Sequence, residues 1–153
     1  MLRSLLLALA APVAMHAQLT MLIVTTTPSG PVEAPAGSVY TFAPVAAGDS
    51  ADARFRARNV SNSGVTLIAI SPLGPPPNGS GFQVQFVPST PYTIAPGNFL
   101  DIYVHFAAGA VGNYTGTLQI STQTASWSVS LQASAIPGPV VTTKLAGFPV
   151  LRL

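Results

Sequence analysis

The chain has 153 residues, of which 48% are hydrophobic and only 7% carry a charge. This length fits one domain, and six Lys and Arg residues are too few for the many phosphate contacts that nucleic-acid binding requires. The chain has no cysteine, which excludes disulfides, thiolate catalysis and Cys-ligated zinc.

The first 17 residues have the three parts of a signal peptide. Arg3 supplies the positive start, residues 5–14 form the apolar stretch, and Ala17 precedes the expected cut, so the mature chain begins at Gln18. The apolar stretch is shorter than the roughly 20 residues of a membrane-spanning helix. We therefore expect a bacterial protein that is secreted, periplasmic or held at the cell surface, with no membrane span after cleavage.

An uncleaved membrane anchor over residues 5–24 is the alternative interpretation of this leader. Pro12, His16 and Gln18 interrupt its apolar run, which disfavours a spanning helix. The sequence leaves open whether the leader is removed or kept.

Short runs that alternate apolar and polar residues fill the chain as far as Ile136, and such runs are typical of β-strands. Residues 18–38 are predicted to form an N-terminal strand, at Leu22–Thr27, and a linker. Residues 39–136 are predicted to form the domain, beginning with a strand at residues 39–42.

The centre of the domain predicts a strand with two chemically different faces. One face is apolar and includes Phe55. The opposite face carries three arginines, Arg54, Arg56 and Arg58. A turn at residues 62–64 follows, and we expect residues 65–71 to return as the partner strand of a hairpin.

Four further strands are expected after a proline-rich loop that contains Pro75–Pro77. They cover residues 82–86, 100–106, 114–121 and 127–133, and the last two form a hairpin. The side chains expected to support the core most are Phe86, Val104, Phe106 and Trp127.

About seven to nine short strands with regularly spaced turns predict an all-β fold, an immunoglobulin-like antiparallel β-sandwich. Each strand buries one apolar face against a second sheet, which explains the alternation. No segment after residue 17 shows a convincing helical period.

Several segments match the motifs of one family: residues 55–64, 67–70, 95–97, 102–106, 112–120 and 129–131. With these motifs residues 39–136 resemble the ASH-type immunoglobulin-like modules, named for the abnormal-spindle and Hydin proteins and related to the major sperm protein fold. Bacterial versions are often called choice-of-anchor D domains. The resemblance implies a non-enzymatic binding or spacer module, often found in arrays on exported proteins. Ala107-Ala108 stands where the family usually has a proline, so we expect an altered turn there.

Residues 137–153 form an apolar tail that echoes an earlier part of the chain. The run at residues 141–150 resembles residues 24–32, about one module length further along. We interpret the tail as the start of a truncated further module, with a chance likeness of two Thr-rich segments as the alternative. An unpaired apolar strand invites strand-mediated self-association.

Arg54, Arg56 and Arg58 are the one candidate site, and they have two interpretations. Alternate residues of a strand lie about 7 Å apart, so the three suit a small face that binds an anion such as an acidic polysaccharide. They also suit a solvated face whose charges prevent edge pairing, which is the commoner role of such residues.

The sequence shows no catalytic, cofactor-binding or metal-binding constellation. Asp101 and His105 lie about 13 Å apart along one strand, too far for a hydrogen bond, and no Gly-x-Ser-x-Gly elbow is present. Asp49 and Asp52 do not supply the roughly six to eight oxygens that calcium prefers. We therefore expect no enzyme activity and no cofactor.

The aromatic residues do not predict a sugar-stacking platform. The alternation of its strand directs Trp127 toward the core. Tyr40, Tyr92 and Tyr103 are predicted at the surface, but they are scattered along the chain. Asn59 begins a glycosylation sequon, which we attribute to chance in a Ser/Thr-rich chain.

The sequence thus predicts an exported, non-enzymatic structural or binding module, a spacer or protein-interaction domain at the cell surface or in the periplasm. One alternative is a periplasmic pilus-type chaperone, which would need a basic carboxylate-anchoring pair between two domains. The other is a carbohydrate-binding module, which would need exposed aromatics in a row. The expected partner is a protein or a cell-envelope polysaccharide, and no nucleic acid. The sequence leaves the choice of partner and the oligomeric state open.

Overall fold

The computed structural model describes residues 19–73 and 81–139, and these residues form twelve β-strands and no helix. The expected signal peptide, the proline-rich loop and the tail beyond residue 139 lie outside the described residues. In chain order the strands are β1 (Leu19–Thr27), β2 (Gly30–Pro35), β3 (Val39–Thr41), β4 (Val45–Ala46), β5 (Ser50–Asn59), β6 (Val65–Leu67), β7 (Ala69–Leu73), β8 (Phe82–Gln85), β9 (Tyr92–Ile94), β10 (Phe99–Ala107), β11 (Gly112–Ser121) and β12 (Ser126–Ile136).

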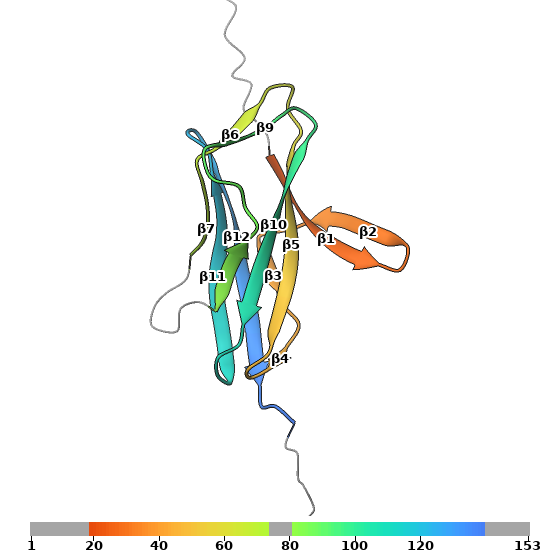
Figure 1. The fold of residues 1–153 in the computed structure, drawn as a ribbon, viewed down its shortest axis with the longest axis vertical. Coiled ribbons are helices and arrows are strands. Elements are labelled where there is room, and N and C mark those ends of the chain that lie inside the picture. Colours follow the sequence, from red (N-terminus) through yellow and green to blue (C-terminus); the bar gives the residue numbers. More distant parts are fainter. Residues whose placement is uncertain (1–18, 74–80, 140–153) are drawn as a thin grey trace, which may run out of the picture.

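Ten of the strands form two sheets that pack face to face (Figure 1). The first sheet has the order β2-β1-β5-β10-β8, and the second has the order β3-β12-β11-β7, with β4 also paired to β12. β6 and β9 pair with each other at one end of the sandwich. β3 and β4 run parallel to β12, and the other pairs are antiparallel. The predicted all-β immunoglobulin-like sandwich is confirmed. It has more strands than expected, because the predicted strand at residues 65–71 is divided into β6 and β7, and because β2, β4 and β9 were not predicted.

The core lies between the two sheets. It is formed by the inward-facing side chains, which occupy every second position of the strands. Phe55 and Phe106 of the first sheet and Leu118 of the second are at most 1% exposed. Val104 is also fully buried, and Trp127 is half-buried and packs against the core. The inward phase predicted for Val104, Phe106 and Trp127 is therefore confirmed.

The prediction that Phe86 supports the core is wrong. β8 ends at Gln85, and Phe86 has a φ of 55°, which takes its side chain out of the strand's alternation. Its side chain is 83% exposed. Phe82 fills the core instead, with its ring centroid 5.0 Å from that of Phe106.

The predicted hairpin between β5 and residues 65–71 does not form. β6 pairs with β9, and β7 pairs with β11 of the second sheet. The chain thus crosses from one sheet to the other after β5. The crossing places the apolar faces of β5 and β7 on opposite sides of one core, which a local hairpin could not do.

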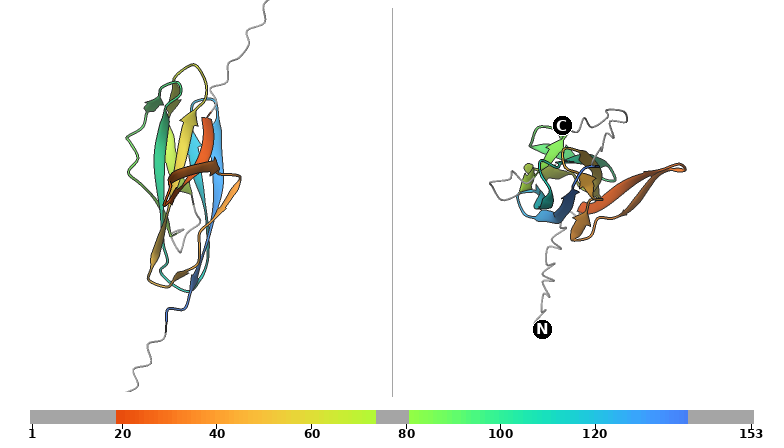
Figure 2. Two further views of the ribbon diagram at one scale, coloured as in Figure 1. Left: turned by 90° about the vertical axis from the view of Figure 1, so that its right-hand side faces the viewer. Right: turned by 90° about the horizontal axis from the view of Figure 1, so that it is seen from below.

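Residues 18–38 form more than the predicted strand and linker. β1 pairs with β5 from Leu19↔Asn59 to Val24↔Arg54, and β2 pairs with β1. The β1–β2 hairpin projects from one side of the sandwich (Figures 1 and 2). The supposed linker is wrong for residues 30–35, because they form an edge strand of the first sheet.

Prolines occupy or interrupt the outer strands β2, β3–β4 and β7, whereas the outer strand β8 contains none. β2 contains Pro31 and Pro35, β7 contains Pro72, and Pro44 separates β3 from β4. The N–H of Ala36 donates to the carbonyl of Met21 at 3.0 Å, so Ala36 faces β1 with its backbone groups. In an antiparallel pair every second residue faces its partner strand in this way, and the residues between them face outward. Pro31 and Pro35 are such intervening residues, so their backbone lies on the outer edge. Proline has no N–H, so these edges offer fewer donors to a further strand.

Asn59 is a buried polar residue that closes the end of β5. Its Nδ2 donates to the carbonyls of Ser63 at 2.7 Å and Ile94 at 2.9 Å. Its Oδ1 accepts from the N–H of Ser61 at 2.9 Å and from the Ser61 hydroxyl at 2.7 Å. A fully buried amide is stable only when satisfied in this way. The sequon asparagine is therefore a structural residue of the folded domain.

Candidate binding face

The three predicted arginines lie on the outer face of the first sheet. They alternate along β5 with Phe55 and Ala57, which are fully buried in the core. β5 is the third of five strands, between β1 and β10. The interpretation that these arginines protect a sheet edge is therefore wrong.

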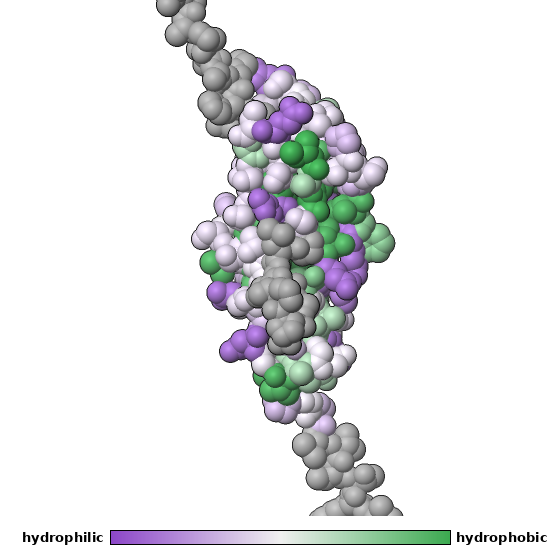
Figure 3. All heavy atoms as spheres, turned by 90° about the vertical axis from the view of Figure 1, so that its left-hand side faces the viewer, coloured by the Kyte–Doolittle hydropathy of each residue, from purple (hydrophilic) through white to green (hydrophobic). Residues whose placement is uncertain are grey.

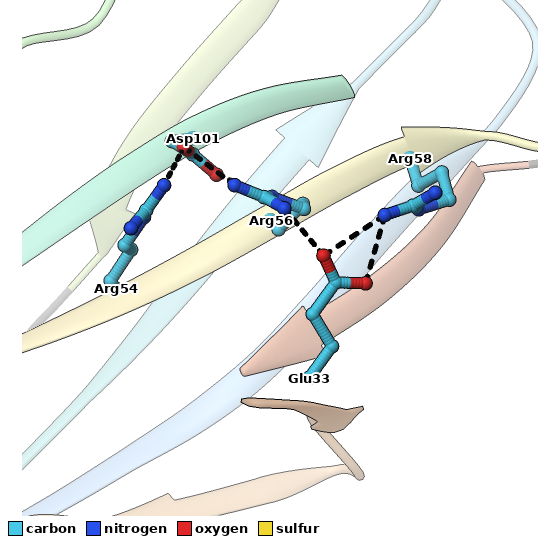
Figure 4. Close-up of polar contacts among 5 residues, drawn as sticks. All are labelled: Glu33, Arg54, Arg56, Arg58 and Asp101. Carbon is cyan, nitrogen blue, oxygen red and sulfur yellow. Dashed lines mark hydrogen bonds and ion pairs between the residues drawn. The ribbon is translucent and has the colours of Figure 1, made fainter. Parts of the chain in front are cut away.

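The arginines and two carboxylates form an alternating row of charges, which we call the arginine network (Figure 4). Its members follow the order Arg54, Asp101, Arg56, Glu33 and Arg58. Asp101 of β10 lies opposite Arg56 in the strand register. Glu33 of β2 reaches the same face across β1. The network therefore ties the projecting hairpin to the central strands.

Each carboxylate of the network binds two guanidinium groups. Asp101 accepts from Nε of Arg56 at 2.7 Å and from its Nη2 at 2.9 Å, and it also accepts from Arg54. Glu33 accepts from Nη2 of Arg58 at 2.9 Å with both oxygens, and also from Arg56. The two parallel bonds between Arg56 and Asp101 give this pair a strong and directional contact.

The contacts of the network shift the pKa values of Asp101 and Arg56. Burial opposes ionisation of Asp101 and is the largest single effect, but the hydrogen bonds from Arg56 and Arg54 outweigh it and hold the pKa of Asp101 below its usual value. The hydrogen bond to Asp101 raises the pKa of Arg56, although this side chain is only 10% exposed. Both groups therefore stay charged at neutral pH.

Aromatic rings lie beside the guanidinium groups on the same face. Cζ of Arg56 is 3.6 Å from the ring centroid of Phe99, and Cζ of Arg54 is 5.7 Å from that of Tyr103. Tyr103 in turn meets Phe86 edge-on, with ring centroids 6.1 Å apart. Cation–π contacts of this kind orient the guanidinium planes, and arginine with aromatic residues is typical of binding surfaces.

The arginine network carries little free positive charge, since three guanidinium groups face two carboxylates. Within the described residues, the Nε–H groups of Arg54 and Arg58 have no hydrogen-bond acceptor. The anion-binding role of Arg54, Arg56 and Arg58 stays a prediction, and the structure shows that most of their charge is compensated inside the protein.

A second group of side chains continues the same outer face toward the other end of β10. Gln85 lies opposite Tyr103 in the register, and Gln83 lies opposite His105. Nδ1 of His105 is 2.7 Å from Oδ1 of Asp52. We call this group the polar strip: Gln83, Gln85, Tyr103, His105, Asp52 and Arg54.

A cavity of about 360 Å³ adjoins the polar strip where β1 separates from β5. The pairing of these strands ends at Val24↔Arg54. The residues that line the cavity are Ile23, Val24, Thr25, Thr26, Tyr40, Asp52, Ala53, Arg54 and Tyr103. The cavity therefore combines two tyrosines, a guanidinium group and a carboxylate with the backbone of the diverging strand.

Two of the three tyrosines predicted at the surface pack against the core instead. The ring of Tyr40 lies edge-on to Phe42 and Phe55, with centroids 5.0 and 5.3 Å away, and burial raises the pKa of Tyr40. Tyr92 is also half-buried against the core. Only Tyr103 keeps the predicted position on the outer face of a sheet.

Exposed apolar side chains occur on several parts of the surface. Seen from the side of β7 and β11, hydrophobic residues gather mainly in the upper half of the molecule (Figure 3). The large hydrophobic residues exposed in the described chain are Val32, Val39, Val60, Ile68, Phe86, Phe99, Val111 and Ile136. Phe86 is the most exposed of them, and both aromatic members lie on or beside the outer face of the first sheet.

The titratable groups of this face contact one another in separate sets. Asp101 binds arginines and His105 binds Asp52, so the two do not pair. Across residues 19–73 and 81–139, no three His, Cys, Asp or Glu side chains form a group that could hold a metal ion. The same stretches contain no helix with the length and apolar character to cross a membrane.

Comparisons with other sequences find no relative of this chain. No family model matches the chain, and no curated protein matches it. The remaining comparison is with solved structures.

Among solved structures, the ASH/PapD-like domain 7 of human CEP192 matches 90% of this chain and 99% of its own length, with a TM-score of 0.53 and 11% identity. A family 123 glycoside hydrolase from Clostridium perfringens matches 65% of this chain with a TM-score of 0.52 and 11% identity, but the chain spans only 23% of that enzyme. WR4, an MSP family member of C. elegans, matches with a TM-score of 0.43 and 7% identity, over 79% of this chain and 100% of its own.

At these identities the likeness concerns the fold alone, and it confirms an immunoglobulin-like fold similar to that of the ASH/PapD-like domain. The more specific choice-of-anchor D assignment stays a prediction.

Sequence reasoning missed two members of this face. Glu33 was placed in a linker, and Phe99 was not singled out. The scarcity of charge was a usable signal, because three arginines on a central strand need acidic partners and the chain has only four acidic residues. Glu33 and Asp101 are two of those four.

Proposed function

We propose that the chain is a non-enzymatic structural or binding module of an exported protein, and that it binds its partner with the outer face of the first sheet. The partner is a protein or a cell-envelope polysaccharide. One observation carries the proposal: six of the seven charged side chains of the described residues lie on this face, namely Glu33, Asp52, Arg54, Arg56, Arg58 and Asp101.

The concentration of charge on one face is unusual for a chain with 7% charged residues. Charged and aromatic groups on a single surface give orientation and specificity to binding. Prolines reduce the donors at the outer edges formed by β2, β3–β4 and β7, which favours binding by a face over strand addition at those edges. The outer strand β8 contains no proline, so strand addition, the binding mode of a pilus-type chaperone, would have to use that edge.

The absence of cysteine makes a clean test of the binding face possible. Gln83→Cys on the first sheet and Gln132→Cys on the second place single thiols at exposed positions of the two outer faces. Each variant is labelled with a bulky polyethylene-glycol maleimide and sedimented with cell-envelope material of the producing organism. We expect the label at position 83 to abolish co-sedimentation and the label at position 132 to leave it unchanged. Equal behaviour of the two labelled proteins would refute the assignment of the face.

Export is the other part of the proposal, and the signal-peptide pattern of residues 1–17 supports it. The exported protein should begin at Gln18, which mass spectrometry of periplasmic and culture fractions measures. Recovery of a chain that still begins at Met1 in the membrane fraction would instead support the uncleaved anchor.

A further inference from the structure

Phe86 is exposed and conformationally costly, and the packing of the domain does not account for it. Its side chain is 83% exposed, and its φ of 55° lies in the left-handed region that bulky residues disfavour. A strained, exposed aromatic residue points to a role outside folding. Its ring meets Tyr103 edge-on and so extends the outer face of the first sheet.

The polar strip next to Phe86 consists mostly of planar groups that between them supply both donors and acceptors of hydrogen bonds. Gln85, Tyr103 and Arg54 lie side by side across three strands. Gln83, His105 and Asp52 form the neighbouring row. Amide, carboxylate, imidazole and guanidinium groups in two adjacent rows match a ligand with many neighbouring hydroxyl groups.

The cavity between β1 and β5 gives this surface depth. Its volume of about 360 Å³ lies in the range of small-ligand sites. Beyond Val24↔Arg54 the two strands no longer pair, and Thr26 and Asp52 line the cavity at this point. The hydroxyl-bearing side chains of Tyr40 and Tyr103 also line it.

Charge compensation distinguishes between an acidic and an uncharged ligand. Arg54, Arg56 and Arg58 are paired with Asp101 and Glu33, and the carboxylate of Asp52, which is 2.7 Å from Nδ1 of His105, lies on the same face and offsets the remaining positive charge. The strip therefore offers hydrogen bonds with little net charge, whereas a polyanion would need uncompensated cations.

From these observations we infer that Phe86, the polar strip and the adjoining cavity form a binding site for an uncharged oligosaccharide. This inference rests on the proposed binding role of the outer face and names its ligand class. The apolar face of a sugar ring packs on Phe86, whose ring is set edge-on to Tyr103, and its hydroxyls bond to Gln83, Gln85, Arg54 and Asp52. One ring enters the cavity beside Tyr40.

The test titrates the purified mature chain with cellohexaose, xylohexaose, mannohexaose and chitohexaose as uncharged probes and with hexagalacturonate as an acidic probe, by calorimetry at two salt concentrations. We expect at least one uncharged probe to bind, with an affinity that salt does not change. Phe86→Ala and Gln85→Ala should each weaken that binding about tenfold. Val111→Ala, an exposed apolar residue of the loop before β11, is the control and should bind as the parent chain does.

The outcomes separate this inference from the proposed function. Binding of hexagalacturonate alone, lost at high salt, overturns the uncharged ligand but keeps a binding face, now through the arginines. Lack of binding to every probe overturns the inference, and the labelled Gln83→Cys and Gln132→Cys proteins then decide the proposed function separately. Binding that Phe86→Ala and Gln85→Ala leave intact also overturns it, because the sugar would occupy another surface.

Discussion

The two outer faces of the sandwich have very different chemistry although they cover the same core. The face of the first sheet carries five charged residues in one hydrogen-bonded row and aromatic rings beside them (Figure 4). The face of the second sheet carries small hydroxyl and amide side chains, among them Thr115, Thr117, Gln119, Ser128, Ser130 and Gln132. No charged side chain of the described residues lies on the β11 and β12 positions of that second face.

The difference agrees with the binding role proposed for the first face. Hydroxyl and amide side chains keep a strand face hydrated without holding one another in a defined arrangement. Cross-strand pairs of Thr and Ser add little to the free energy of unfolding. A row of half-buried ion pairs requires desolvation and correct geometry, and such pairs are seldom retained for stability alone. The predictions below test this contrast by changing one face and leaving the other intact.

Asp101→Asn should have the largest effect, because it leaves Arg54 and Arg56 without their shared anion. We expect a loss of about 2–3 kcal/mol in the free energy of unfolding, less than the value for a fully buried pair because Asp101 is 19% exposed. Urea unfolding followed by tryptophan fluorescence measures it. A loss below about 0.5 kcal/mol would mean that the network contributes as little as an exposed ion pair.

Acid should weaken the first sheet through the same carboxylate. The pKa of Asp101 is lower in the folded than in the unfolded chain, so its stabilising contribution is complete above about pH 4 and is lost as the pH falls through the lower, folded value. Urea midpoints between pH 5 and pH 2 should fall more steeply for the parent chain than for Asp101→Asn. Parallel pH profiles of the two proteins would contradict this assignment.

Glu33→Gln should loosen the projecting hairpin while the sandwich stays folded. Glu33 is 30% exposed, so the loss of its contacts with Arg56 and Arg58 should cost about 0.5–1 kcal/mol. Hydrogen exchange should become faster in β1 and β2 and remain unchanged in β12. Uniform acceleration across all strands would show that Glu33 supports the whole domain instead.

Phe86→Gly should stabilise the domain slightly, an unusual result for removal of an aromatic ring. Glycine accepts the φ of 55° without strain, and this gain exceeds its entropic cost by about 0.5 kcal/mol. Phe86→Ala keeps the strain and is the matched control, so it should not gain stability. Thermal unfolding compares the two, and a melting temperature of Phe86→Gly below that of Phe86→Ala would contradict the strain argument.

Thr117→Val on the second face should have the smallest effect. The side chain lies opposite Ser130 and touches no charged group in the register of β11 and β12. We expect a change within about 0.5 kcal/mol in either direction. A larger change in the urea midpoint would show that the second face is also more than a solvated surface.

Local patterns were enough to predict much of the fold. The alternation in β10 and β12 predicts the buried positions of Val104 and Phe106 and the inward phase of Trp127, because a period of two depends only on neighbours in the chain. The partners of β6 and β7 were missed, since the crossing between sheets depends on which distant strands share the core.

Only the members of the candidate site that lie on one strand, β5, were predicted from the sequence. Arg54, Arg56 and Arg58 share a face because they alternate on β5. Glu33 joins them through two strand pairings, of β2 with β1 and of β1 with β5, which no local pattern contains. Phe86 was assigned to the core because phenylalanine gives no signal of a positive φ, as a glycine would have done.

The prolines of the outer strands have a consequence for proteins that carry several such modules on one chain. Short linkers hold neighbouring modules at effective concentrations of about the millimolar range. At such concentrations, bare strand edges would join adjacent modules into one continuous sheet. Pro31, Pro35, Pro44 and Pro72 interrupt or remove donors along the edges formed by β2, β3–β4 and β7, which leaves β8 as the edge through which adjacent copies can still pair.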